Sequence, residues 1–275
     1  MHRRDFLAQS AALSLLPLLV RRRTNLAIGF QSWVVRADLA ADFPGTLAKM
    51  AAMGYETFEM CSPVGYRRYG FGPLAELSAT DMKSIITDAG LTCISSHYTT
   101  PELREDLPAR IEFAKQLGLN QMVVSSPGIG ANATLDEWKN AIDEINGWGR
   151  AATDSGLTFA YHNHNFEFAK VEGQLIYDLL LQGLDPSVVK MQFQVWVVSI
   201  GYQAADYFRA APERFVSAHL ADWTGVEAER APVGGGVVDW PDFFNAGTGL
   251  KNIYVEMAPE FLPDSATYLH SLRSP

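Results

Sequence analysis

The feature of this sequence that most constrains its fold is a recurring dipeptide, a glycine followed by an apolar or aromatic residue. It occurs as Gly54-Tyr55, Gly90-Leu91, Gly118-Leu119, Gly156-Leu157, Gly183-Leu184 and Gly249-Leu250. A glycine just past a helix supplies the left-handed position that ends it, and the next apolar residue packs back onto the helix. A strand-like apolar run follows each dipeptide. The sequence therefore predicts helices that alternate with strands.

Two further apolar runs complete a set of eight predicted strands. The strands are expected at residues 26–33, 57–61, 92–97, 121–126, 157–163, 189–196, 215–220 and 252–257. Helical patterns include residues 44–53, 80–89, 103–117, 135–154 and 204–211, and a short closing helix is expected at 265–272. Asp42 and Ser78 are predicted helix caps, and Thr134 with Glu137 fits a capping box.

Eight strands alternating with helices are typical of a single-domain α/β fold, the (β/α)8 TIM barrel, here over residues 25–275. A doubly wound open sheet is the alternative. That fold would need a glycine-rich phosphate-binding turn after the first strand, and Phe30-Gln31-Ser32-Trp33 is not one. The barrel is therefore the predicted fold.

The amino-acid composition and net charge indicate which classes of binding partner are unfavourable for this chain. The chain has 275 residues, is 48% hydrophobic and carries a formal net charge of −9, which argues against nucleic acid or an anionic membrane as a partner. Cys61 and Cys93 both lie in apolar, strand-like runs. We expect them to be buried free thiols rather than a disulfide.

The first 24 residues differ from the rest. Arg3-Arg4 precedes an apolar stretch at residues 6–20, which resembles a twin-arginine export signal. The stretch is short for a membrane span, so no stable span is expected. The expectation is a signal or N-terminal extension at 1–24 and a periplasmic protein. A basic amphipathic extension on a cytoplasmic protein is the alternative.

Polar residues gather at the predicted strand ends, where TIM barrels hold their active sites. Four of the six histidines lie there: His97, His162, His164 and His219. Any one of them could be an ordinary core histidine, but scattered core histidines would not gather on one rim. A carboxylate such as Glu256, inside an apolar strand, is costly unless it is paired or bound to a cation. The pattern predicts a functional site at this rim.

Several motifs at these strand ends resemble the sugar phosphate isomerase/epimerase family, the xylose isomerase-like TIM barrels. They are Gly29-Phe30-Gln31-Ser32-Trp33, Ile94-Ser95-Ser96-His97-Tyr98, Tyr161-His162-Asn163-His164-Asn165-Phe166-Glu167-Phe168, His219-Leu220-Ala221-Asp222-Trp223 and Tyr254-Val255-Glu256. The resemblance covers nearly the whole chain after Asn25. It points to a secreted branch that often carries twin-arginine signals, and it implies a divalent metal ion, commonly Mn²⁺, Mg²⁺, Co²⁺ or Zn²⁺.

Carried over to this sequence, the resemblance implies roles for individual residues. The expected metal ligands are His162, His164, Gln194, His219 and Glu256. The expected catalytic residues are Glu167, Glu256 and His97. The expected substrate-binding residues are Trp33, Glu59, His97, Trp196 and Asp222. From their place at strand ends, the two tryptophans could stack on a sugar ring or simply cap the barrel. The departure from the family is at Gln194, where an aspartate is usual; glutamine offers a neutral oxygen and no charge.

The leading functional hypothesis is metal-assisted isomerisation or epimerisation of a carbohydrate through an enediolate. A keto-glycoside lyase or hydrolase would need the same acidified C–H bond. A non-catalytic sugar-binding barrel that has lost its metal is another alternative, and a metal-dependent endonuclease is disfavoured by the acidic charge. The sequence does not decide whether the protein forms a homo-oligomer.

Overall fold

The computed structural model describes residues 25–130, 132–227 and 229–273. The predicted export signal at 1–24 lies outside the described residues. Among the helices that are described, none is both long and apolar enough to cross a membrane.

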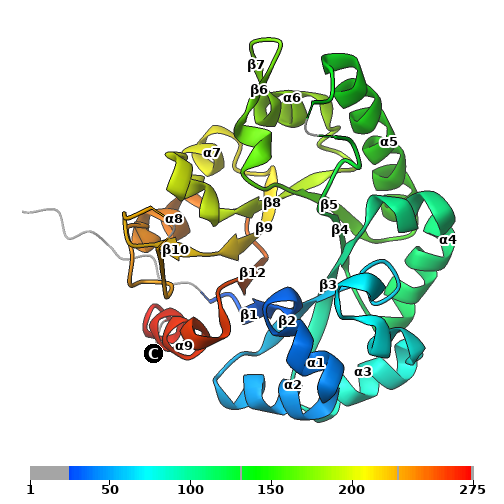
Figure 1. Ribbon diagram of the computed structural model, residues 1–275, viewed down its shortest axis with the longest axis vertical. Helices are drawn as coiled ribbons and strands as arrows, with labels where there is room; N and C mark the ends of the chain where they lie inside the picture. The colour runs from blue at the N-terminus through cyan, green and yellow to red at the C-terminus, as the bar shows by residue number, and fades with distance from the viewer. Residues whose placement is uncertain (1–24, 131, 228, 274–275) are drawn as a thin grey trace, which may run out of the picture.

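Eight parallel strands close into a barrel (Figure 1). In chain order they are β1 (Ile28–Gln31), β2 (Thr57–Cys61), β3 (Thr92–Tyr98), β4 (Gln121–Val124), β5 (Thr158–His162), β8 (Lys190–Gln194), β9 (Phe215–Leu220) and β12 (Asn252–Val255). The barrel closes because β1 pairs with β2 on one side and with β12 on the other. The predicted TIM barrel is confirmed.

Helices surround the barrel on the outside (Figure 1). They are α1 (Arg36–Ala41), α2 (Phe43–Ala52), α3 (Ala79–Asp88), α4 (Thr100–Leu117), α5 (Leu135–Asp154), α6 (Ile176–Gly183), α7 (Ala204–Ala210), α8 (Trp240–Ala246) and α9 (Leu262–Ser271). The predicted caps are confirmed: Asp42 accepts from Gly45 N, Ser78 accepts from Asp81 N, and Thr134 forms a capping box with Glu137.

The recurring glycines do not all act alike. Gly54, Gly90, Gly118 and Gly156 have φ between +79° and +95°, the left-handed conformation that was predicted. Gly183 and Gly249 do not have this conformation. A Cβ on Gly249 would lie 2.2 Å from the Pro212 carbonyl oxygen, so glycine is needed there because the backbone comes close.

Four predicted strands, β1, β4, β8 and β12, end two residues earlier than expected. Ser32–Val35 and Val195–Ile200 form 3-10 helices instead of extending β1 and β8. The cause is the residue before each: the side-chain oxygen of Gln31 or Gln194 accepts the backbone N–H two residues on and turns the chain. Two small hairpins were not predicted, β6 (Lys170–Val171) with β7 (Gln174–Leu175), and β10 (Asp222–Trp223) with β11 (Arg230–Ala231).

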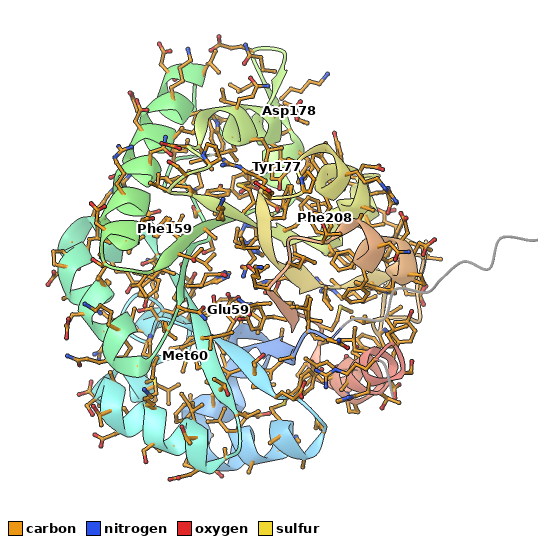
Figure 2. All side chains as sticks on the ribbon, turned by 180° about the vertical axis from the view of Figure 1, so that it is seen from behind. Glu59, Met60, Phe159, Tyr177, Asp178 and Phe208 are labelled. Carbon is orange, nitrogen blue, oxygen red and sulfur yellow. The ribbon has the colours of Figure 1, made fainter. Side chains whose placement is uncertain are left out.

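The apolar core lies between the barrel and its helices. Large buried side chains such as Phe159, Tyr177 and Phe208 fill it (Figure 2). The barrel interior is more polar. There Gln121 and Gln192 both donate to Ser217 Oγ, and Gln192 also donates to Glu59. TIM barrels usually fill this space with branched apolar residues. Here the hydrogen bond from Gln192 to Glu59 links the polar layer to the strand ends above it.

Candidate functional site

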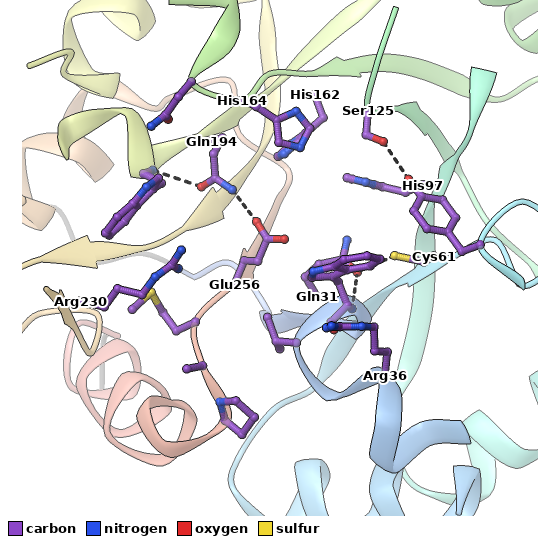
Figure 3. Close-up of a pocket in the computed structure, with 18 residues that line it drawn as sticks. Gln31, Arg36, Cys61, His97, Ser125, His162, His164, Gln194, Arg230 and Glu256 are labelled. Atoms are coloured by element: carbon purple, nitrogen blue, oxygen red, sulfur yellow. Dashed lines mark hydrogen bonds between the residues drawn. The ribbon is translucent and has the colours of Figure 1, made fainter. Parts of the chain in front are cut away.

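A cavity of about 720 Å³ opens at the carboxyl ends of the barrel strands, large enough for a sugar-sized ligand (Figure 3). Seven of the residues predicted for the site line it: Trp33, His97, His162, His164, Gln194, Trp196 and Glu256. The other four predicted residues, Glu59, Glu167, His219 and Asp222, do not line this cavity.

Glu59 lies fully buried at the centre of the site, below the cavity. Its Oε1 accepts from Ser95 Oγ at 2.6 Å and from Gln192 Nε2 at 2.8 Å, and its Oε2 accepts from Gln31 Nε2 at 2.7 Å. His97 Nε2 lies 3.0 Å from the same Oε2. Burial alone would raise the pKa of Glu59, but the neighbouring histidines hold that pKa well below its usual value. Glu59 is therefore a fixed negative charge that does not line the cavity.

His219 bridges two carboxylates. Its Nε2 bonds to Glu59, and its Nδ1 lies 3.1 Å from Glu256 Oε2. Burial alone would lower the pKa of His219, but the two carboxylates raise it above its usual value. Burial alone would raise the pKa of Glu256, and the charge of His219 instead lowers it. Glu256, at the end of β12, is therefore a carboxylate that faces the cavity.

Three imidazoles form a compact buried cluster. The nitrogen atoms that His97, His162 and His219 can offer to a metal ion all lie within 4.8 Å of one another. Burial, and then the neighbouring imidazoles, lower the pKa of His162 well below its usual value, so this ring is neutral. Its buried Nδ1 has no hydrogen-bond partner among the described residues. An orphaned imidazole nitrogen beside two other histidines suits a divalent metal such as Zn²⁺ or Co²⁺. The donor set therefore fits a metal ion, whose binding would release the proton that the two carboxylates hold on His219.

This cluster differs from the ligand set expected from the sequence, because it contains His97 and not His164. The ring of His164 is 5.0 Å from that of His162 and is stacked with Phe166 at 5.9 Å. His164 therefore lies at the edge of the cluster, on the cavity wall.

Gln194 also behaves differently from a simple ligand. Its Oε1 accepts from Trp196 N, and its Nε2 donates to Glu256 Oε2 at 2.5 Å (Figure 3). The backbone N–H of Trp196 fixes which end of the amide is oxygen. In this position Gln194 donates a hydrogen bond to Glu256 and offers its oxygen to the backbone.

Two acidic residues predicted for the site, Glu167 and Asp222, accept hydrogen bonds from loop residues and do not line the cavity. Glu167 accepts from Tyr161 Oη at 2.7 Å and from His164 N at 2.8 Å, and burial raises its pKa to about 8. Asp222 is fully buried and accepts from five donors, which are the indole of Trp240 and the backbone N–H groups of Trp223, Gly234, Gly236 and Val238. Neither Glu167 nor Asp222 is among the residues that line the cavity.

A repeated module at the site was not predicted. Gln31-Ser32-Trp33 ends β1, and Gln194-Val195-Trp196 ends β8. In both, the glutamine oxygen accepts from the tryptophan N–H and the glutamine nitrogen donates to a glutamate. The shared Gln-x-Trp spacing is the sequence signal that could have revealed it. Gln31, Cys61, Arg36 and Arg230 are further cavity residues that were not predicted.

A closed eight-stranded barrel with a cavity and clustered histidines at the carboxyl ends of its strands places the chain among the TIM-barrel proteins. Comparison gives the family. The family described as "Xylose isomerase-like TIM barrel" matches residues 47–250, and the chain belongs to it.

Two solved structures, both described as sugar phosphate isomerase/epimerase from Parabacteroides distasonis, are similar to this chain. One is 28% identical with a TM-score of 0.72 and covers 90% of this chain and 94% of its own. The other is 25% identical with a TM-score of 0.70 and covers 88% of this chain and 96% of its own. The IOLI protein, whose crystal structure includes a zinc atom, shares the fold at 14% identity and a TM-score of 0.63, over 90% of this chain and 96% of its own. No curated protein sequence matches significantly.

Proposed function

We propose that this chain is a metal-assisted isomerase or epimerase that acts on a sugar or sugar derivative in the barrel-rim cavity. The observation that carries the proposal is the buried cluster of His97, His162 and His219, beside the carboxylate of Glu256, at the floor of a sugar-sized cavity. The similarity to sugar phosphate isomerase/epimerase structures supports the same reaction class.

The residues divide the work as follows. His97, His162 and His219 would hold the ion, and Glu256 lies beside His219. When bound, a divalent ion supplies a Lewis acid that polarises a carbonyl and stabilises an enediolate. Glu256, whose pKa is held low and which lines the cavity, accepts the proton from the substrate carbon and returns it. His97, also at the cavity wall, is the second group able to carry a proton.

The test combines metal analysis with proton exchange. Purified protein would be analysed for bound metal and then incubated with a panel of keto and aldo sugars in D₂O, with deuterium uptake at the carbon next to the carbonyl followed by NMR. We expect bound metal, uptake by at least one sugar, and loss of uptake in Glu256→Gln. A folded, metal-loaded protein that exchanges no proton with any sugar would contradict the proposal.

A non-catalytic sugar-binding barrel is the second candidate. It is favoured by one observation: Gln194, in place of an aspartate, donates to Glu256 instead of adding a charge to the site. Sugar binding without metal and without exchange would favour it.

We also propose export through the twin-arginine route, on the basis of Arg3-Arg4 and the apolar stretch after them. Replacing both arginines with lysine should retain the protein in the cytoplasm of a host that has this pathway. Unchanged fractionation into the periplasm would contradict the proposal.

A further inference from the structure

Two arginines line the cavity without a carboxylate partner. Arg36 and Arg230 form no ion pair within the described part of the chain. Four of the ten described arginines do form one, Arg67, Arg104, Arg209 and Arg273, and none of these four lines the cavity. The neighbouring acid, Glu229, does not pair with Arg230, because its carboxylate accepts from Thr224 Oγ1 at 2.8 Å. In a chain of net charge −9, two unpaired cations at one cavity are a local reversal of the overall charge.

Each arginine is stacked on the tryptophan of a Gln-x-Trp module. The guanidinium carbon of Arg36 lies 4.3 Å from the ring centroid of Trp33, and that of Arg230 lies 4.2 Å from the ring centroid of Trp196. Stacking holds the plane of a guanidinium and leaves the N–H donors on its edge free for a planar anion. The same set of contacts occurs at both strand ends: a glutamate accepts from the glutamine, the glutamine accepts from the tryptophan N–H, and the arginine stacks on the tryptophan ring.

The two pairs are not equivalent. Arg36 already donates from Nη1 to the Trp33 carbonyl oxygen at 2.8 Å. The Arg230 guanidinium has no hydrogen bond to any described residue. Figure 3 shows Arg230 on the side of Gln194 and Arg36 on the opposite side of Glu256. Arg230 also follows β9, the seventh barrel strand, in the region where TIM barrels often bind anionic groups.

We propose that the cavity selects sugar derivatives that carry an anionic group, a carboxylate or a phosphate, and that Arg230, supported by Trp196, binds this group. The inference rests on the proposed function, because it names the substrate class of the same site. A charged acceptor forms stronger hydrogen bonds with a guanidinium than a sugar hydroxyl does. The Arg230 pair would therefore distinguish a sugar acid or sugar phosphate from its neutral parent.

The experiment measures binding rather than turnover. Titration calorimetry at low ionic strength would compare D-glucuronate and D-glucose 6-phosphate with D-glucose on the full chain. We expect at least one anionic sugar to bind about tenfold more tightly than glucose, as about 1.4 kcal/mol from one charge-assisted contact requires. The preference should shrink in high salt. The carboxylate and phosphate arms show which anion is preferred.

Three variants locate the contact. Arg230→Met should abolish the preference by weakening the binding of the anionic sugar, and Arg230→Lys should keep part of it. Arg36→Met should change the preference by less than about threefold, because one of its donors already serves the Trp33 carbonyl. The matched control is Arg68→Met, which removes an arginine stacked on Tyr69 outside the cavity and should change nothing. Thermal unfolding would verify that each variant is folded.

The outcomes separate the two proposals. Equal affinity for neutral and anionic sugars, or a preference that survives in Arg230→Met, would overturn this inference and leave the proposed function intact. If none of these three sugars binds to the folded protein, this inference fails, and the proposed function is still decided by the proton-exchange panel. Anion-selective binding without proton exchange would support the inference and count against the isomerase.

Discussion

Glu59 is the residue on which the site depends most. Donors from four other strands converge on its carboxylate, through Gln31, Ser95, Gln192 and the two histidines His97 and His219. The sequence predicted a substrate contact for Glu59. The structure instead places it where it sets the orientation of two imidazoles, the kind of outer contact that tunes a metal ligand.

Replacing Glu59 with glutamine should therefore destabilise the fold strongly. The amide has one oxygen and its NH₂ would face other donors, and removing one partner from a buried charge network typically costs about 3–5 kcal/mol. Urea unfolding at pH 7 would measure this loss. Glu76→Gln, which removes an exposed carboxylate paired with Arg67, is the control and should cost less than about 1 kcal/mol. A small effect at Glu59 would show that its charge is not needed.

A second prediction for a single residue concerns Gln194. Gln194→Asp should lower the melting temperature in EDTA, because two carboxylates would then face each other at Glu256. Added Mn²⁺ should raise the melting temperature more than in the wild type, since a carboxylate adds a hard, charged ligand.

The control for this charge effect is Gln194→Ala, which removes the hydrogen bond without adding charge. It should show no increased response to Mn²⁺. If Gln194→Asp and Gln194→Ala respond alike, the aspartate has not restored a ligand and Gln194 is a structural residue.

At the scale of elements, side chains at the strand ends decide where strands stop. Apolar patterning predicted β1 and β8 to run two residues beyond their observed ends. Patterning reports which face is buried, but it does not report that Gln31 and Gln194 bond to the backbone ahead of them and start a 3-10 turn. The same turns place Trp33 and Trp196 at the cavity.

The start of α4 contains a buried acid that should affect stability with pH. Glu102 accepts from Ser62 Oγ at 2.7 Å and Thr99 N at 2.7 Å, and burial raises its pKa to about 7. In the unfolded chain its pKa is near 4.3. At a pH between these two pKa values, the Glu102 carboxyl is protonated in the folded chain and ionised in the unfolded chain. The free energy of unfolding therefore falls as the pH rises from about 4.5 to 7.

Glu102→Gln should flatten this part of the pH profile. The wild type should lose up to about 3 kcal/mol relative to the variant between pH 4.5 and 8. Urea unfolding of both proteins across this range, with the difference taken at each pH, separates Glu102 from other acids. Parallel profiles would show that Glu102 does not titrate in this way.

The whole molecule is held by a barrel that closes between its first and last strands. Near the end of the chain, Arg273 donates to the Leu26 carbonyl oxygen and pairs with Glu56, which links the segment after α9 to the start of the barrel. The strand order was predictable, because parallel strands joined by helices have few arrangements. Long-range contacts such as this one have no local signature in the sequence.

The reactivity of the two cysteine thiols measures how tightly the whole chain is packed around them. Both are free and buried, as predicted, and burial raises the pKa of Cys93 to about 12 and that of Cys61 well above its usual value. A thiol reagent should therefore react very slowly with native protein and with two thiols per chain after unfolding in guanidinium. Melting should be unaffected by reducing agent. Rapid reaction of one thiol in the native state would show that the cavity admits the reagent to Cys61.

The sequence by itself determined the barrel, the helix caps, the buried thiols and the rim on which histidines gather. Those features follow from hydrophobic period, glycine position and capping chemistry, which act over a few residues. Only the tertiary structure decided which side chains meet. It brings His97 next to His162 and His219. It places Glu167 and Asp222 in contact with loop backbone outside the cavity lining, and it stacks Arg36 and Arg230 on the two tryptophans. Those contacts depend on strand register and loop paths, which residues far apart in the chain set together.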